Sequence, residues 1–321
     1  MAGLDLELNE QQTLLSDAVA RLVADVASPS WADLTEQLGL GGLTLPEDHG
    51  GFGGGMIDVA LVMALLGPAL SGADWLSHAA ACSVLGGGED LASGKRRAAL
   101  VSIATAASVP TLHEGHRIEG SARLVAGAAQ ASQFVVALDD GLFMVTADAA
   151  GLSVEQGQLH DGSAVADLHF AGVAAKPIAG DPAAVSALVL AGRCAEAVGL
   201  LQRMLVDTTD YLGQRRQFGA PIASFQALRH RLADMQLALL QAQALTEAAI
   251  MAQDHSDLLA ACVAVRDAAR IVGEGAVQLH GAMGLTEELR LGARFKRLLV
   301  IAAGLGSESA LLSQFAAAAQ R

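Results

Sequence analysis

Hydrophobic positions recur at helical spacing through the first ninety residues. The segment Asn9–Val26 carries apolar residues every four positions, at Leu14, Ala18, Leu22 and Val26. This spacing predicts a helix, with Asn9 as its N-cap. A second helix is predicted over residues 31–38, and helical patterning continues to about Leu91. These segments predict an N-terminal helical domain over residues 1–97.

The pattern changes in the middle of the chain. Between residues 98 and 179, short apolar runs alternate with Gly and Asp turns, which predicts β-strands. The tripeptide Asp139-Asp140-Gly141 lies between two such runs and is typical of a hairpin. Residues 98–180 are therefore expected to form a small β-domain.

Long amphipathic segments dominate the remainder. Asp181-Pro182 has the form of an N-cap followed by proline in the first turn. Helices are predicted at Val185–Leu212, Phe225–Gln253, Ser256–His280 and from Gly304 to the end. Four such helices predict a bundle over residues 181–321. The expected fold is mainly α with a central β-domain.

Composition narrows the function classes. Apolar residues make up 52% of the chain but aromatics only 3%, which favours Ala-rich packed helices over an all-β fold. A net charge of −14 argues against binding to nucleic acid or an anionic membrane surface. No apolar run is long enough to span a membrane without a charge or a glycine cluster. The acidic, polar N-terminus is not a signal peptide, so we expect a cytoplasmic protein.

Cysteines and basic residues add two expectations. Cys82, Cys194 and Cys262 lack metal-ligand spacing and are expected to be small buried side chains in a reducing compartment. The few basic residues cluster at 215–216, 229–231 and 290–297. Such clusters suit an anionic ligand, although arginines at helix ends also complement the helix dipole. For each cluster alone the two interpretations are balanced.

The segment from Tyr211 to Met235 reads YLGQRRQFGAPIASFQALRHRLADM. Arginines end one predicted helix, Gly219 and Pro221 mark a turn, and Ser224 is expected to cap the next helix. The string resembles the pattern R-x-Q-F-G-x-P-I-x-x-F-Q-x-x-x-H-x-L-A-D-M of the acyl-CoA dehydrogenase family. Similar family patterns lie at 38–53 and 119–137, so the resemblance covers essentially the whole chain. It implies an N-terminal α-domain, a small β-barrel or sandwich and a C-terminal four-helix bundle.

The resemblance also implies FAD. In the family, the arginine and phenylalanine of R-x-Q-F and the glutamine of F-Q help to hold FAD across a subunit interface. By position these are Arg215, Phe218 and Gln226. A forked guanidinium suits a diphosphate, and an aromatic ring suits a flat cofactor.

A second pattern begins at Gln278 and reads QLHGAMG. It resembles the family's Q-x-x-G-G-x-G, which lines the FAD diphosphate of a neighbouring subunit. This implies cofactor contacts from Gln278, Gly281 and Ala282, with Ala282 in place of the second glycine. The alternative is a glycine C-cap with Gln278 exposed. His230 and His280 have no partner at a useful spacing for a catalytic base, so core or capping roles are expected for both.

The family's catalytic base is not found at either of its usual places. The reaction removes the α-proton of an acyl-CoA thioester with a glutamate while hydride passes from the β-carbon to flavin N5. Leu305 occupies the usual position of that glutamate, and Val189 occupies the position used by a minority of members. Glu308, three residues further on, could serve only after a register slip, and Glu196 is a weaker candidate.

Two features of a complete member that cover the flavin ring, a T-E-P-x-x-G-S-D-like loop and a W-I-T-N-like strand, are also missing. The chain therefore resembles the short, base-lacking subunit of heteromeric actinobacterial-type enzymes. This implies a catalytic partner in an α2β2 assembly, an acyl-CoA substrate, and electron-transfer flavoprotein or a similar acceptor. The alternatives are a self-sufficient enzyme that uses Glu308, and a flavin-free scaffold.

Overall fold

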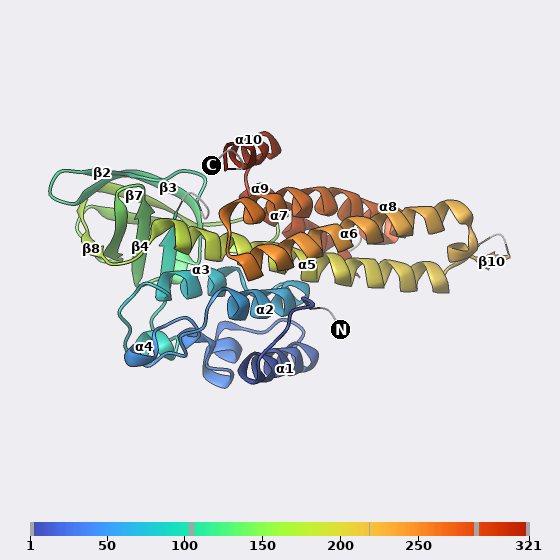
Figure 1. Ribbon diagram of the computed structural model, residues 1–321, viewed down its shortest axis with the longest axis horizontal. Helices are drawn as coiled ribbons and strands as arrows, with labels where there is room; N and C mark the ends of the chain where they lie inside the picture. Colours follow the sequence, from blue (N-terminus) through green and yellow to red (C-terminus); the bar gives the residue numbers. More distant parts are fainter. Residues whose placement is uncertain (1–2, 103–105, 218, 286–288, 319–321) are drawn as a thin grey trace.

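The computed structural model describes residues 3–102, 106–217, 219–285 and 289–318. Figure 1 shows most of the strands gathered at one end, long helices extending from them to the other end, and the N-terminal helices along one side of the long helices. The expected fold, mainly α with a central β region, is confirmed.

The N-terminal region contains the helices α1 (Glu10–Asp25), α2 (Met56–Leu66), α3 (Ala73–Cys82) and α4 (Glu89–Ala92). Asn9 caps α1 as predicted, because its side chain accepts a hydrogen bond from the Gln12 N–H at 2.8 Å. The Gln12 side chain accepts one from the Asn9 N–H at 3.2 Å, which completes a capping box. The helix predicted over residues 31–38 is a short π-helical turn, Asp33–Gln37.

Two four-stranded sheets form the β region. One has the order β1-β4-β5-β8 and the other β2-β3-β7-β6. Strands β4 and β5 are joined by Asp139-Asp140, with Leu138 opposite Gly141, so the predicted hairpin is confirmed. The strands are β1 (Ala98–Val101), β2 (Thr111–His113), β3 (Arg117–Ala126), β4 (Gln133–Leu138), β5 (Gly141–Thr146), β6 (Leu152–Gln158), β7 (Ala164–Ala174) and β8 (Lys176–Ile178).

Strand β4 explains how the sandwich attaches to the helices. All six of its residues are buried. Phe134 and Val136 pack into the core between the two sheets, whereas Val135 and Ala137 belong to the helical core on the other face. Because successive side chains point to opposite faces of a strand, a strand covered on both sides must be a continuous apolar run. The sequence FVVAL has this form.

The C-terminal helices form the bundle. They are α5 (Pro182–Gln214), α6 (Gln226–Ala252), α7 (His255–Ala268), α8 (Gly275–His280), α9 (Leu291–Gly304) and α10 (Glu308–Ala318), with the short strands β9 (Arg216–Gln217) and β10 (Ala220–Pro221) between α5 and α6. Asp181 caps α5 as predicted, because its carboxylate accepts from the Ala183 N–H. A π-helical stretch, Ala269–Glu274, divides the third predicted helix.

The fourth helix, predicted from Gly304 to the end, corresponds to α10, which begins at Glu308 and is described to Ala318; the helix before it, α9, was not predicted. Helix α9 is already formed at Leu291 and ends at Gly304, and α10 follows at an angle of 46° to it. Gly306 between them has φ +102°, a conformation that glycine adopts readily and that ends a helix.

One apolar core joins the N-terminal helices to the bundle. Its buried members run from Val19 to Leu311 and include both faces of the α2–α5 contact. The proposed boundaries after residues 97 and 180 remain predictions. Helix α5 is long and apolar enough to cross a membrane by length and composition alone, but 67% of its most apolar window is buried inside the molecule. It is the central helix of this core.

Helices α2 and α5 approach at backbone distance. A Cβ built on Gly199 would lie 2.0 Å from the Ala64 carbonyl oxygen. Backbone cannot move aside as a flexible side chain can. Glycine at position 199 therefore sets how closely the N-terminal helices pack on the bundle.

We expect Gly199→Ala to lower the free energy of unfolding by about 1–3 kcal/mol, because the added methyl must push two helices apart. Urea unfolding followed by circular dichroism measures this. Gly213→Ala is the matched control, since no atom lies within 4 Å of its added Cβ. That control should gain up to about 1 kcal/mol from helix propensity. Equal midpoints for the two variants would contradict the proposed contact.

Candidate functional site

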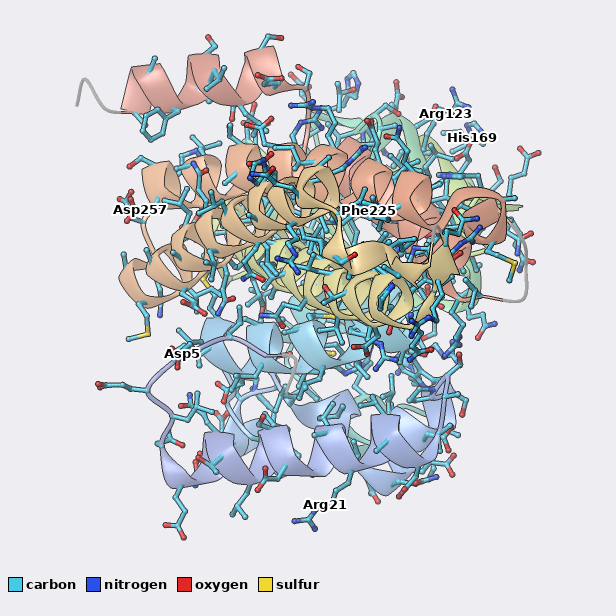
Figure 2. The ribbon with its side chains drawn as sticks, turned by 90° about the vertical axis from the view of Figure 1, so that its right-hand side faces the viewer. Asp5, Arg21, Arg123, His169, Phe225 and Asp257 are labelled. Atoms are coloured by element: carbon cyan, nitrogen blue, oxygen red, sulfur yellow. The ribbon has the colours of Figure 1, made fainter. Side chains whose placement is uncertain are left out.

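The joint between α5 and α6 forms one end of the bundle. The chain leaves α5 at Gln214 and reverses through the antiparallel pair β9–β10. It enters α6 at Gln226. Ser224 does not cap α6 as expected: its hydroxyl donates to the Pro221 carbonyl at 2.7 Å, and Phe225 occupies the N-cap position. Figure 2 looks onto this end of the bundle, with Phe225 labelled at the start of α6.

Tyr211 connects the two FAD patterns that the sequence analysis identified. Its ring stacks on the buried His280 ring, with 4.3 Å between centroids and 19° between planes. Its hydroxyl donates to the His280 carbonyl at 3.2 Å and accepts a hydrogen bond from the Arg215 guanidinium. Arg215 and His280, the residue before Gly281, are far apart in the chain and both contact this one tyrosine.

Gln278 and Gly281 are exposed at the same end. The Arg231 guanidinium donates to the Gln278 side-chain oxygen, which fixes the amide. Gly281 has φ +62°, yet an added Cβ would meet no atom within 4 Å. Glycine is needed there for its conformation, and the backbone beside it is open. Exposed backbone N–H groups and guanidinium groups are suitable ligands for a phosphate.

The other residues predicted to bind the cofactor are Gln226, Ala282 and Phe218. Gln226 is exposed as the first residue of α6, and Ala282 is exposed in the turn after α8. Phe218 lies outside the described residues. His280 has the expected core role, since its Nδ1 lies 2.8 Å from the Ala276 carbonyl oxygen. The core role expected for His230 is wrong, because that side chain is exposed.

Both positions that the resemblance implies for the base are buried and apolar. Leu305 is 4% exposed and Val189 is 1% exposed. Glu308 starts α10 and is exposed, so it reaches no enclosed space. Val189 lines a cavity of about 50 Å³ between α3, the sandwich, α5 and α9, together with Ser77, Leu124, Arg193 and Arg297 among others. Sites for small organic ligands commonly have volumes of about 300–1,000 Å³.

Beside this cavity, Arg297 makes two ion pairs. It binds Glu196 in a bidentate fashion at 2.6 and 2.9 Å, and Asp161 at 3.2 Å. Burial alone would raise the pKa of Asp161, but hydrogen bonds from Ser163 and the charge of Arg297 outweigh it, so that pKa is lowered. Burial likewise opposes the charge of Arg297, and Glu196 and Asp161 overcome it and raise the pKa of Arg297. Glu196 is committed to this ion pair and is unsuited to act as a base.

This cluster was not predicted from the sequence, where Glu196 had no partner and Arg297 was grouped only with the basic residues 290–297. One signal was present: an acid at Glu196 interrupts the apolar run from Cys194 to Leu201, where a buried charge needs a partner. Which arginine supplies that partner depends on the packing of α9 against α5.

Comparison with known proteins identifies the family. The family described as acyl-CoA dehydrogenase, C-terminal domain, matches residues 191–320. Acyl-CoA dehydrogenase IpdE2 of Mycobacterium tuberculosis is 30% identical over 319 residues, covering 90% of this chain and 91% of IpdE2. The chain belongs to the acyl-CoA dehydrogenase family. Solved acyl-CoA dehydrogenases share its fold throughout.

Two of these structures show the extent of the shared fold. A chain of the ChsE4–ChsE5 complex from Mycobacterium tuberculosis superposes with a TM-score of 0.86 at 23% identity, covering 97% of this chain and 98% of that one. Butyryl-CoA dehydrogenase from Megasphaera elsdenii superposes with a TM-score of 0.77 at 20% identity, covering 99% and 100%. This member of the acyl-CoA dehydrogenase family therefore has the complete fold, with apolar side chains at Leu305 and Val189.

We expect Arg297→Met to lower the free energy of unfolding by about 3–5 kcal/mol, because it leaves Glu196 buried without a counter-charge. Adding Glu196→Gln should recover part of the loss. The control is Arg203→Met, which removes a half-exposed pair with Asp207 and should cost at most about 1 kcal/mol. Urea unfolding at pH 7 measures all three.

The difference in the free energy of unfolding between wild type and Arg297→Met should depend on pH. The pKa of Asp161 is lower in the folded state, so its contribution is present above its unfolded value and is lost as the pH falls through the folded value. The difference between wild type and Arg297→Met should therefore shrink below about pH 4. A constant difference from pH 7 to pH 3 would contradict the role given to Asp161.

Proposed function

We propose that this chain is the non-catalytic subunit of a heteromeric FAD-dependent acyl-CoA dehydrogenase. The cofactor would lie between it and a complete, catalytic acyl-CoA dehydrogenase subunit. The occupation of both base positions by the buried apolar side chains of Leu305 and Val189 carries the proposal. Neither side chain can accept a proton from a substrate.

The nearby carboxylates do not replace the missing base. Glu196 is buried, and its two carboxylate oxygens accept hydrogen bonds from Nε and Nη2 of Arg297. A general base must be able to approach the carbon acid and take up its proton. The ion pair fixes the Glu196 carboxylate in place and occupies both of its oxygens, so Glu196 can do neither. Glu308 is exposed at the start of α10, where water keeps it an ordinary surface acid.

The space available also favours a shared site. The cavity beside Val189 has a volume of about 50 Å³, which is too small for an isoalloxazine ring and an acyl chain. The described residues at the bundle end, in contrast, fit the diphosphate part of FAD. They combine an exposed guanidinium, an exposed amide and an open glycine backbone, on a chain whose net charge is −14.

Each of these residues has a binding role in the proposal. Arg215, oriented by Tyr211, and the backbone at Gly281 would bind diphosphate oxygens, and Gln278 would donate beside them. Gln226 and Ala282 would line the same surface. A bound flavin supplies a hydride acceptor for α,β-desaturation. The catalytic subunit would supply the base and the acyl-CoA pocket, and the residues of this chain would bind and orient.

The relatives support a class of substrate. A similar fold is found in the ChsE4–ChsE5 complex and in the Tcur3481–Tcur3483 steroid enzyme. We therefore extend the proposal to a lipid or steroid acyl-CoA, an α2β2 assembly, a cytoplasmic location, and electron-transfer flavoprotein or a similar acceptor.

The deciding experiment is the visible absorption spectrum of the purified chain, alone and co-purified with a co-expressed catalytic acyl-CoA dehydrogenase. We expect flavin only in the complex, at one FAD per pair of subunits. One flavin per chain in the isolated protein, with desaturation of acyl-CoA, would contradict the proposal and return attention to Glu308. A complex without flavin would favour a scaffold.

We expect Arg215→Ala to raise the dissociation constant of FAD for the complex by about 10- to 100-fold, because it removes a charge-assisted hydrogen bond. Flavin fluorescence during titration measures this. Arg216→Ala is the matched control: it makes the same change of charge one residue away. An equal loss of FAD affinity in the two variants would indicate only a general effect of positive charge. Unchanged FAD affinity in both variants would contradict the binding role of Arg215.

A further inference from the structure

Arg231 and Gln278 form a polar contact between α6 and α8, at the end of the bundle that carries the residues predicted to bind FAD. The Arg231 guanidinium donates a hydrogen bond to Oε1 of Gln278, 47 positions further along the chain. Gln278 is exposed and Arg231 is half-buried. An exposed glutamine side chain samples several rotamers, and ordering it costs entropy. A residue that orders Gln278 before a ligand arrives lowers the cost of binding that ligand.

The helices that carry these two side chains are packed closely beside the contact. Met235, one turn after Arg231 on α6, is 1% exposed. A Cβ built on Gly275, three residues before Gln278 on α8, would lie 3.0 Å from Sδ of Met235. Glycine at position 275 thus lets α8 approach α6. The hydrogen bond between Arg231 and Gln278 therefore joins two fixed helices rather than two loops.

A π-helical stretch, Ala269–Glu274, separates α7 from α8. Each π turn holds more residues than an α turn, and one added residue rotates all following side chains by about 100° around the helix axis. Without this stretch, Gln278 would face a different side of the bundle. Such π segments are frequent at functional sites.

Carboxylates near Arg231 do not take the place of Gln278. A hollow of about 220 Å³ beside the contact is lined by Arg231, Asp234, Arg270 and Glu274 among others. Within the described ranges, neither Asp234 nor Glu274 forms an ion pair with Arg231. The guanidinium is therefore hydrogen-bonded to a neutral amide although acidic side chains line the same hollow.

Arginine can pair with a glutamine amide in only one orientation. A guanidinium has N–H donors and no acceptor, whereas a primary amide has one oxygen that accepts and one NH2 group that donates. Arg231 can therefore bond only to Oε1, which leaves the NH2 group of Gln278 on the other side of the amide. Diphosphate oxygens accept hydrogen bonds, so they bind the NH2 group and are repelled by the amide oxygen.

We infer that Arg231 is a positioning residue: it holds the Gln278 amide with its NH2 group available to the FAD diphosphate and does not itself bind the cofactor. The inference rests on the proposed function, because it requires FAD at this end of the bundle. The family pattern that covers Arg215 to Met235 leaves position 231 open. The role of Arg231 therefore comes from its contact with Gln278 and not from the resemblance.

The test is a double-mutant cycle, in which flavin fluorescence follows the titration of the flavin-free complex with FAD at 50 mM and 500 mM NaCl. Gln278→Ala should raise the dissociation constant of FAD by about tenfold, because it removes one hydrogen bond to a charged group. Arg231→Met should raise it by about three- to tenfold, because the amide can then turn. The double variant should bind FAD as Gln278→Ala does, since Arg231 acts only through Gln278.

Two further variants separate positioning from charge. Arg231→Lys should recover most of the affinity that Arg231→Met loses, because an ammonium group also donates and cannot accept. Arg270→Met is the matched control: it removes the same charge from the same hollow and should change the dissociation constant by less than about twofold.

Losses of FAD affinity that add in the double variant would overturn the inference, because Arg231 would then bind FAD directly. An unchanged dissociation constant in Arg231→Met would also overturn it, as would a loss that disappears at 500 mM NaCl, where general charge effects are screened. In these outcomes the wild-type complex still binds FAD and the proposed function stands. A wild-type complex that binds no FAD would overturn both.

Discussion

The ion pairs of Arg297 are the interaction on which the arrangement of this molecule depends. One guanidinium on α9 binds Glu196 on α5 and Asp161 in the sandwich, so three regions of the chain meet at a single buried charge. Such a cluster is costly to form and much costlier to leave incomplete. It fixes the sandwich against the bundle, and it does so beside the small cavity that contains Val189.

The Arg297 ion pairs also affect which side chains near Val189 could act as a base. Glu196, seven residues along α5 from Val189, is held in an ion pair. Leu305 and Val189, at the positions that the resemblance implies for the base, are apolar members of the helical core. The chain thus has the acyl-CoA dehydrogenase fold with packed apolar side chains at both of these positions. At the other end of α5, Tyr211 holds Arg215 and the turn after α8 together. The two ends of α5 therefore present different surroundings: a buried ion pair beside packed apolar side chains at one end, and exposed polar and cationic groups at the other.

Much of this could be predicted from the sequence, and the failures have physical reasons. Periodicity predicted α1, α5, α6 and the β4–β5 hairpin, because amphipathic spacing and turn residues are local signals. Helix α9 was not predicted because residues 290–297 were interpreted only as a basic cluster, and the ion pairs that bury Arg294 and Arg297 depend on tertiary contacts. Ser224 was given a capping role from its residue type, but its hydroxyl bonds backward to Pro221. The Arg297 cluster and the Tyr211 stack depend on contacts between residues 69 to 136 positions apart, which no local pattern encodes.

The single core that joins α2 to α5 also affects how the chain folds during synthesis. Helices α1 to α4 are complete at residue 92, yet the helix against which they pack ends only at residue 214. At about 5–20 residues per second, the ribosome needs roughly 6 to 24 s to make the intervening chain. For that time α2, which carries seven buried residues in the folded protein, lacks the part of its packing that α5 supplies. The N-terminal third of the chain therefore completes its packing only after α5 has been synthesised.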